Sequence, residues 1–250
     1  MFITPIQLVM ALLVLTILLL LMLSKVYIRR LKHYTSPLLG DVEVWQRVNG
    51  EKYLTINKSV QGISIEKSSV KKSYWYFIAQ KVLDHCKKRA SPHILFLGLG
   101  ANTSSLLISN KNPKIHQTII EIEEIIIDAC RRFFNLDELK NYTLVHSDIH
   151  ELINKREDFN NKFDVIVVDV FSGEPPFVSL ETNEPTFIEK LMRWAKKDAL
   201  LIFNRHADTP HAQKIGQELY QHLLTLSSRV GLTSIKDPRG YENFVITVRV

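Results

Sequence analysis

The balance of hydrophobic and polar residues changes twice along the chain. Residues 1–24 carry no charged side chain and are apolar almost throughout. Short strand-like runs follow in 40–72, and from Pro92 onward short apolar runs alternate with stretches of helical periodicity. The pattern predicts an N-terminal apolar helix, a small β domain over 40–72 and an α/β domain over 73–250.

The segment 1–24 is predicted to be a transmembrane anchor. Only Gln7 and Thr16 interrupt its apolar run, and as a helix it spans roughly 36 Å, against a hydrocarbon core of about 30 Å. A cleaved signal peptide would carry a positive N-terminal region, a shorter apolar stretch and a small-residue cleavage site, which this segment lacks.

The residues after this segment, 25–39, are predicted to form a basic juxtamembrane linker. Because positive charge is retained on the cytoplasmic side of a membrane, we expect a single-pass membrane protein whose larger domain lies on the cytoplasmic side. The basic cluster consists of Lys25, Arg29, Arg30 and Lys32.

In the small β domain, strands are expected over 42–48, 52–56 and 61–65. The first two are joined by Asn49-Gly50, the strongest short hairpin signal in a sequence. The domain is therefore built around a β-hairpin.

The larger domain is predicted to be an α/β domain with a doubly wound, mostly parallel sheet. Its strands alternate with helical stretches, which favours parallel pairing through right-handed crossovers. The alternation of apolar residues near the C-terminus is typical of an added antiparallel strand. The expected strands cover 94–97, 117–120, 142–145, 164–168, 200–203, 232–235 and 244–250.

Composition excludes several classes of protein. Of the 250 residues, 46% are apolar and 23% charged, which is typical of folded chains and not of disordered ones. The formal net charge is +6, and the basic cluster supplies four of these charges, so the remainder is too weakly basic for a nucleic-acid partner. Cys86 and Cys130 are far apart, and the histidines lack ligand spacing, so we expect no metal site.

Residues able to bind a ligand fall at the ends of four successive strands. Gly98 and Gly100 follow the first, Glu121 ends the second, Asp148 follows the third and Asp169 the fourth. Ligands of doubly wound sheets bind outside the carboxyl ends of the strands. Glycines allow a ligand to approach the backbone, and an acid about 20 residues later can accept both hydroxyls of a ribose. These positions together predict a nucleoside site.

The nucleoside is expected to lack phosphate groups. A nicotinamide dehydrogenase favours a third glycine where this chain has Thr103, and no basic residue lies between Gly98 and Leu106. S-adenosylmethionine or a relative of it therefore fits better than a dinucleotide.

Several motifs between Gly40 and Val250 carry a family resemblance. The most specific is Phe163-Asp-Val-Ile-Val-Val-Asp-Val-Phe-Ser172, and others are 93–100, 120–123, 129–134 and 146–148. Together they resemble the spermidine synthase (polyamine aminopropyltransferase) family. The resemblance implies a Rossmann-like fold of the class I S-adenosylmethionine-dependent methyltransferase type behind a small hairpin domain. Members are often dimers, so a homodimer is implied as well.

The resemblance also implies roles for individual residues. Asp169 would be the catalytic base, and the acceptor would be a small-molecule amine. Decarboxylated S-adenosylmethionine, or S-adenosylmethionine itself, would be the co-substrate. The implied cofactor-binding residues are Gly98, Gly100, Glu121, Asp148 and Gln61, with Glu121 on the ribose and Asp148 on the adenine. The implied substrate-binding residues are Tyr74 or Tyr76, Ser172, Glu174 and Asp237.

The chain departs from the family pattern mainly at the positions that the resemblance implies for binding the amine substrate. The acid of the glycine loop is Ala101 here, and the second acid of the catalytic motif is Ser172, with Glu174 close enough to compensate. Asp237 stands where the family has a tyrosine before Pro-x-Gly. Three functions stay open: aminopropyl transfer in polyamine biosynthesis, methyl transfer to another acceptor, and a non-catalytic, membrane-anchored nucleoside-binding protein.

Overall fold

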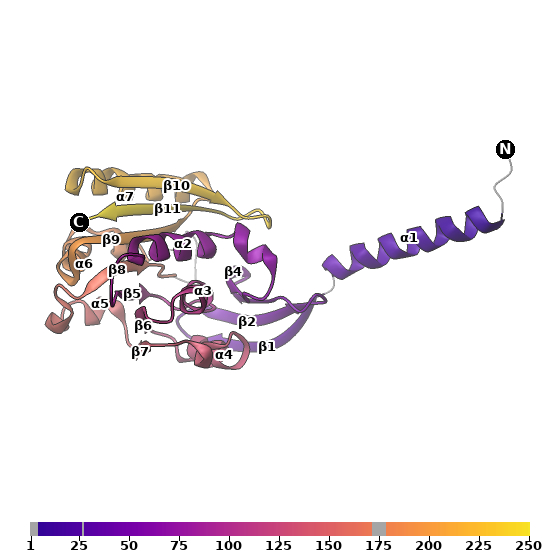
Figure 1. Ribbon diagram of the computed structural model, residues 1–250, viewed down its shortest axis with the longest axis horizontal. Helices are drawn as coiled ribbons and strands as arrows, with labels where there is room; N and C mark the ends of the chain where they lie inside the picture. The colour runs from indigo at the N-terminus through magenta and orange to yellow at the C-terminus, as the bar shows by residue number, and fades with distance from the viewer. Residues whose placement is uncertain (1–4, 27, 172–178) are drawn as a thin grey trace.

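Two β-sheets form the body of the protein (Figure 1). The structure is a computed structural model that describes residues 5–26, 28–171 and 179–250, with the backbone alone at 20–26 and 28. The first sheet is antiparallel, with the strand order β1-β2-β3-β4. Its strands are β1 (Ile28–Ser36), β2 (Gly40–Arg47), β3 (Lys52–Ile56) and β4 (Ser59–Ile63).

Two tight turns set the register of the small sheet. Asn49 accepts a hydrogen bond from the backbone of Glu51 at 3.0 Å, as the hairpin signal predicts. Between β3 and β4, Asn57 and Lys58 both have positive φ angles, which is the geometry of a two-residue hairpin turn.

The second sheet has the strand order β10-β11-β9-β8-β5-β6-β7. The pairs β7–β6, β6–β5, β5–β8 and β8–β9 are parallel, and β11 pairs antiparallel with both β9 and β10. The prediction of a mostly parallel sheet with an antiparallel strand at the C-terminus is confirmed. The strands are β5 (His93–Leu97), β6 (His116–Glu121), β7 (Tyr142–His146), β8 (Phe163–Val168), β9 (Ala195–His206), β10 (Val230–Lys236) and β11 (Glu242–Arg249).

Helices cover both faces of this sheet, which explains the continuous apolar runs of its central strands. In β8, Val165 and Val167 pack in one core with α2, α3, α4 and the small sheet, whereas Ile166 and Val168 pack in a second core with α5, α6 and α7. The α-helices are α2 (Tyr74–Cys86), α3 (Thr103–Lys111), α4 (Glu124–Phe133), α5 (Ile149–Leu152), α6 (Pro185–Trp194) and α7 (Pro210–Leu226). The 3₁₀ helices are η1 (Ser68–Lys72), η2 (Leu136–Glu138), η3 (Glu157–Phe159) and η4 (Leu180–Asn183).

The N-terminal helix α1 (Pro5–Val26) extends away from the two sheets (Figure 1). Among the residues that the structure describes, none of the helices combines the length and the apolar character needed to cross a bilayer. The predictions of a transmembrane anchor over 1–24 and of a membrane localisation with the catalytic domain on the cytoplasmic side are therefore wrong.

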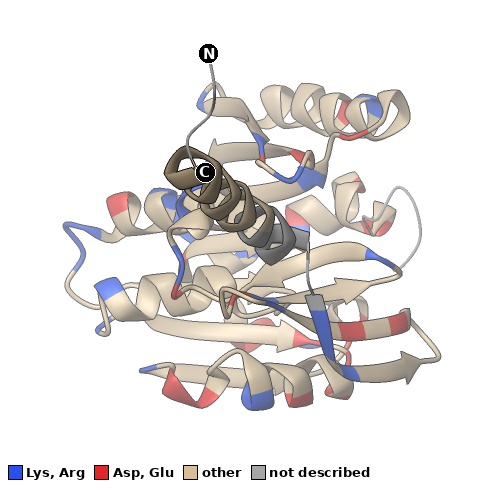
Figure 2. Cartoon of the chain, turned by 90° about the vertical axis from the view of Figure 1, so that its right-hand side faces the viewer, with Lys and Arg blue, Asp and Glu red and all other residues tan. Residues whose placement is uncertain are grey.

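The segment 25–39, expected to be a linker, contains strand β1 instead. Arg30 forms an ion pair with Glu43 of β2 at 2.8 Å, and the Tyr34 hydroxyl donates to Asp128 of α4 at 2.9 Å. The basic residues of this segment favour a linker, but Leu31 and Tyr34 pack against the core, which makes the segment part of the fold. Basic and acidic segments are interspersed over this side of the body (Figure 2).

Candidate active site

A cavity of about 550 Å³ opens at the carboxyl ends of the parallel strands, between the large sheet and the small one. This volume is within the usual range for small-molecule sites. Strand order reverses around β5, which has β6 on one side and β8 on the other, and such switch points bind ligands in α/β sheets. Predicted residues from six segments line the cavity together: Gln61, Tyr74, Gly98, Gly100, Glu121, Asp148 and Asp169.

The glycine loop after β5 needs its glycines because neighbouring backbone lies against it. Gly98 has a φ of 92°, and a Cβ there would overlap the backbone oxygen of Asp169. Gly100 has a φ of 53°, and a Cβ there would lie 2.6 Å from the backbone oxygen of Gln61. Because these two glycines have no side chain, the backbone of Asp169, after β8, and of Gln61, in β4, can pack directly against the loop.

Glu121, at the end of β6, is held by two backbone N–H groups. Its Oε2 accepts from Leu99 and its Oε1 from Glu123, each at 2.9 Å. Burial raises the pKa of Glu121, and these hydrogen bonds work against the rise. Each oxygen of an ionised carboxylate keeps a second lone pair, so the side chain can still accept from two hydroxyls of a ligand.

Asp148 begins α5 and lines the cavity at the same time. Its Oδ1 accepts from the backbone N–H of His150 at 2.8 Å, which is an N-cap contact. The cap fixes the orientation of the carboxylate, and its remaining oxygen is available to a ligand at the cavity wall.

Asp169, after β8, is half-buried at the cavity wall between two donors. Asn204 Nδ2 donates to its Oδ1 at 2.7 Å, and the Tyr74 hydroxyl lies 3.5 Å from its Oδ2. Burial raises the pKa of Asp169, while the Asn204 hydrogen bond and the charges of His206 and Arg205 lower it. The pKa of Tyr74 is raised well above its ordinary value, first by burial and then by Asp169, so this phenol stays a donor.

The remaining predicted residues are not at the cavity wall. Tyr76 is half-buried on α2 and absent from the lining, which leaves Tyr74 as the tyrosine of the cavity. Asp237 is buried in an ion pair with Arg239, whose Nε lies 2.6 Å from its Oδ1 and whose guanidinium covers the Trp75 ring. Ser172 and Glu174 lie outside the described residues.

Other lining residues were not predicted from the sequence. His150 Nε2 lies 3.1 Å from Ser179 Oγ, which donates to Glu181 Oε2 at 2.7 Å. His150 belongs to α5, whereas Ser179 and Glu181 belong to the start of η4, and only the fold brings these two segments together, so no local pattern indicates the three residues. Asn204 could have been found, because it directly follows the expected strand 200–203 and obeys the same strand-end rule as Asp169.

The charges around the cavity suit a positively charged ligand. Four carboxylates line the cavity: Glu121, Asp148, Asp169 and Glu181. Within the described part of the chain, no Lys or Arg is among the lining residues. A sulfonium or an amine would be stabilised there. Across 5–26, 28–171 and 179–250, no group of three or more His, Cys, Asp or Glu side chains is placed to hold a metal ion.

Comparison with known proteins gives the same fold and indicates a family. Residues 78–233 match the spermine/spermidine synthase domain. A probable spermidine synthase from Corynebacterium glutamicum superposes with a TM-score of 0.70 at 16% identity, covering 88% of this chain and 79% of that one. A spermidine synthase in complex with the transition state analogue AdoDATO gives a TM-score of 0.67 at 14% identity, covering 88% and 73%.

Curated relatives match shorter stretches. A polyamine aminopropyltransferase from Vibrio vulnificus is 28% identical over 112 residues, covering 44% of this chain and 36% of that protein. An eEF1A lysine and N-terminal methyltransferase from Xenopus laevis is 32% identical over 101 residues, covering 39% and 14%. An N-terminal histidine N-methyltransferase from Emericella nidulans is 31% identical over 122 residues, covering 48% and 21%. The matches therefore span at most about a third of these curated proteins.

Proposed function

Since the chain belongs to the spermine/spermidine synthase family, we propose that it is a transferase that moves an aminopropyl group from decarboxylated S-adenosylmethionine to a small-molecule amine. The observation that carries the proposal is the shared cavity, which Asp169 and Tyr74 line together with Glu121 and Asp148, while Asn204, outside the lining, donates to Asp169. The homodimer implied by the resemblance has no support here and is not part of the proposal.

The nucleoside would lie along the ends of β5, β6 and β7. Glu121 would accept the ribose hydroxyls, and Asp148 would accept the adenine amino group. The sulfonium would sit near Asp169, where the carboxylates of the cavity compensate its positive charge. Gln61, Gly98 and Gly100 would border the aminopropyl tail, since all three line the cavity between β4 and the glycine loop.

The chemical step requires alignment and an unprotonated amine. The acceptor nitrogen forms a bond to the carbon next to sulfur, the C–S bond breaks, and its electron pair stays on sulfur as a neutral thioether. The nitrogen is then a cation, and Asp169 takes its proton. A sulfonium is already a good leaving group, so the protein gains most from holding the two reactants in line.

Methyl transfer from S-adenosylmethionine is the second candidate, because the glycine loop lacks an acid. Ala101 is buried, and a Cβ added to Gly62 of β4 would overlap its side chain. At this position the glycine loop therefore packs against β4 through an apolar contact and offers no carboxylate to an aminopropyl nitrogen. Two methyltransferases among the curated relatives favour the same candidate.

Calorimetric titration of the full chain separates these functions. Decarboxylated S-adenosylmethionine, S-adenosylmethionine and methylthioadenosine are compared, and tighter binding of the decarboxylated form, with turnover of an amine, supports aminopropyl transfer. Tighter binding of the intact form supports methyl transfer. Binding of all three without any turnover indicates a nucleoside-binding protein, and no binding overturns the proposed site.

A further inference from the structure

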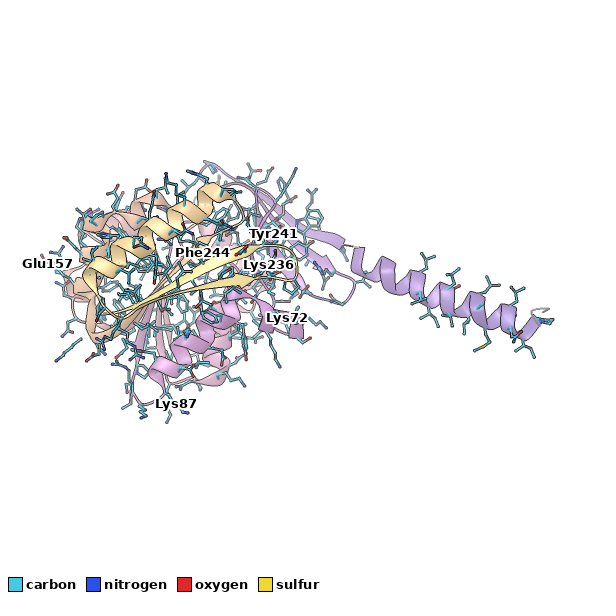
Figure 3. The ribbon with its side chains drawn as sticks, turned by 90° about the horizontal axis from the view of Figure 1, so that it is seen from above. Lys72, Lys87, Glu157, Lys236, Tyr241 and Phe244 are labelled. Atoms are coloured by element: carbon cyan, nitrogen blue, oxygen red, sulfur yellow. The ribbon has the colours of Figure 1, made fainter. Side chains whose placement is uncertain are left out.

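A second, smaller pocket of about 220 Å³ lies between the small sheet and the turn that joins β10 to β11. Among the described residues, it shares no lining residue with the cavity at the carboxyl ends of the strands. Figure 3 shows Tyr241 and Lys236 at the end of the β10–β11 hairpin that faces the small sheet. The charged and aromatic residues of this basic pocket are Arg47, Glu51, Tyr53, Lys58, Arg239 and Tyr241.

Local backbone structure fixes the walls of the basic pocket. Tyr53 alternates with the core residue Leu54 along β3, so it lies on the opposite face of the strand. In the turn across the pocket, the backbone N–H of Asp237 donates to the carbonyl of Tyr241 at 2.8 Å, which closes the β10–β11 hairpin. Both walls of the pocket therefore belong to hydrogen-bonded β structure.

Several donors of the basic pocket have no acceptor in the protein. Arg47 Nε is buried and lies 3.5 Å from Glu51 Oε2, but it forms no hydrogen bond with any residue that the structure describes. Within the same described ranges, the exposed ammonium of Lys58 and the hydroxyls of Tyr53 and Tyr241 also form none. Polar groups at buried sites are nearly always hydrogen-bonded. The pocket is therefore rich in donors that a ligand with several acceptor oxygens would satisfy.

The carboxylates near the pocket already have partners. Glu51 is buried, with its Oε1 accepting from Ser69 Oγ and its Oε2 facing Arg47. Asp237 lies outside the lining and pairs with Arg239, whose Nε donates to its Oδ1 at 2.6 Å. Among the described residues, three cations line the pocket and outnumber these two carboxylates. The pocket therefore keeps a net positive charge, which favours an anion.

We propose that the basic pocket binds a phosphate group, as free phosphate or as part of a small phosphorylated molecule. Its donors come from β2, β3, the β3–β4 turn and the β10–β11 turn, so they reach a ligand from several sides. A tetrahedral phosphate offers acceptor oxygens in all of these directions, and guanidinium and ammonium groups both bind it. The pocket is smaller than the usual site of a drug-sized ligand, which fits a small anion.

A stack of side chains lies between the basic pocket and the acidic cavity. The Arg239 guanidinium lies 5.3 Å from the centre of the Trp75 ring, and the Trp75 ring lies 4.3 Å from that of Tyr74, which lines the cavity. The carboxylates of the cavity repel phosphate, whereas the cations of the basic pocket attract it. Phosphate binding and nucleoside binding are therefore separate properties, and the first does not depend on the proposed transferase activity.

The test is calorimetric titration of the full chain with inorganic phosphate at constant ionic strength. The wild type should bind phosphate, and Lys58→Met should weaken this binding about tenfold, because a hydrogen bond to a charged group is lost. Lys58 is exposed in the β3–β4 turn and forms no ion pair with another described residue, so its replacement should leave the fold intact.

Lys87→Met is the matched control. Lys87 is also exposed, follows α2 and lies away from the β10–β11 hairpin in Figure 3, and it lines neither site. This variant should bind phosphate as the wild type does. An equal loss in Lys58→Met and Lys87→Met would show attraction to the surface charge alone and would overturn the proposal. Tyr241→Phe, which removes one hydroxyl and no charge, should weaken binding about two- to tenfold.

Two further ligands identify the source of the phosphate group. Tighter binding of glycerol 3-phosphate than of inorganic phosphate supports an organic phosphate as the ligand, and equal binding supports the free ion. Acetate that binds as tightly as phosphate, or the absence of phosphate binding, contradicts the proposal.

Saturation with methylthioadenosine should leave the phosphate affinity unchanged, since the two sites share no lining residue among those described. A chain that binds phosphate but no nucleoside would defeat the proposed function and leave the basic pocket supported. A phosphate affinity that falls when methylthioadenosine is bound would place the phosphate in the acidic cavity and overturn the inference.

Discussion

The two halves of the cavity are built in different ways. At the half proposed to hold the nucleoside, the functional groups follow the ends of successive strands and are fixed by nearby backbone, as Glu121 is by Leu99 and Glu123. At the half proposed to hold the acceptor, Asp169 is contacted by side chains from distant segments, with Tyr74 coming from α2 and Asn204 from β9. The positions in the first half follow from the strand-end rule of the fold, whereas the contacts in the second half are tertiary contacts that this rule does not specify.

This difference predicts that binding and turnover can be separated by mutation. Asp169→Asn keeps the shape of the side chain and removes the proton acceptor, so turnover should fall roughly 10²- to 10⁴-fold. Nucleoside affinity should stay within about tenfold of the wild type, since the ribose and adenine contacts remain. Steady-state kinetics and calorimetry with methylthioadenosine measure the two quantities, and wild-type turnover in the variant would leave Asp169 with a structural role only.

Glu121→Gln tests the other half. The neutral amide offers one acceptor oxygen in place of two and meets the Leu99 and Glu123 N–H groups with an NH₂ group on one side. Affinity for methylthioadenosine should fall about 10- to 100-fold, with a smaller loss of turnover at saturation. Glu124→Gln, on the first turn of α4 and not among the cavity-lining residues, is the matched control. Equal losses in the two variants would show that Glu121 does not contact the ligand.

The pH dependence of binding sharpens the same contrast. Burial raises the pKa of Glu121, so the carboxylate becomes protonated at a pH above the ordinary glutamate value of about 4.3. Lowering the pH through that pKa should weaken methylthioadenosine binding, toward the affinity of Glu121→Gln. Calorimetry at pH values lowered stepwise from neutral should therefore show a fall in affinity in the wild type and in Asp169→Asn, and a flatter dependence in Glu121→Gln. A fall that survives in Glu121→Gln would assign it to another group.

The sequence alone predicts the strand-end residues of the site better than the residues whose contacts come from distant segments. The strands of the large sheet and their terminal residues Gly98, Glu121, Asp148 and Asp169 were predictable, because each signal is local and the fold brings such ends together. The ion pair of Asp237 with Arg239 was not, since a resemblance in spacing does not indicate which partner a charged side chain finds. The prediction of a linker in place of strand β1 is wrong, because it rests on the basic residues of this segment. The pairing of β1 with β2 makes the segment a strand, and this pairing cannot be read from the sequence of β1 alone.

The smallest expected effect concerns Tyr74, which the sequence could not distinguish from Tyr76. Only Tyr74 lines the cavity, and its hydroxyl lies 3.5 Å from Asp169, a long contact that contributes little in the free protein. Tyr74→Phe should therefore reduce turnover about two- to fivefold, while Tyr76→Phe, on the same turn of α2, should change it less than about twofold. Because Tyr74 belongs to the acceptor half, methylthioadenosine affinity should not change in either variant. A loss of affinity in Tyr74→Phe would mean that the two halves of the cavity are not independent.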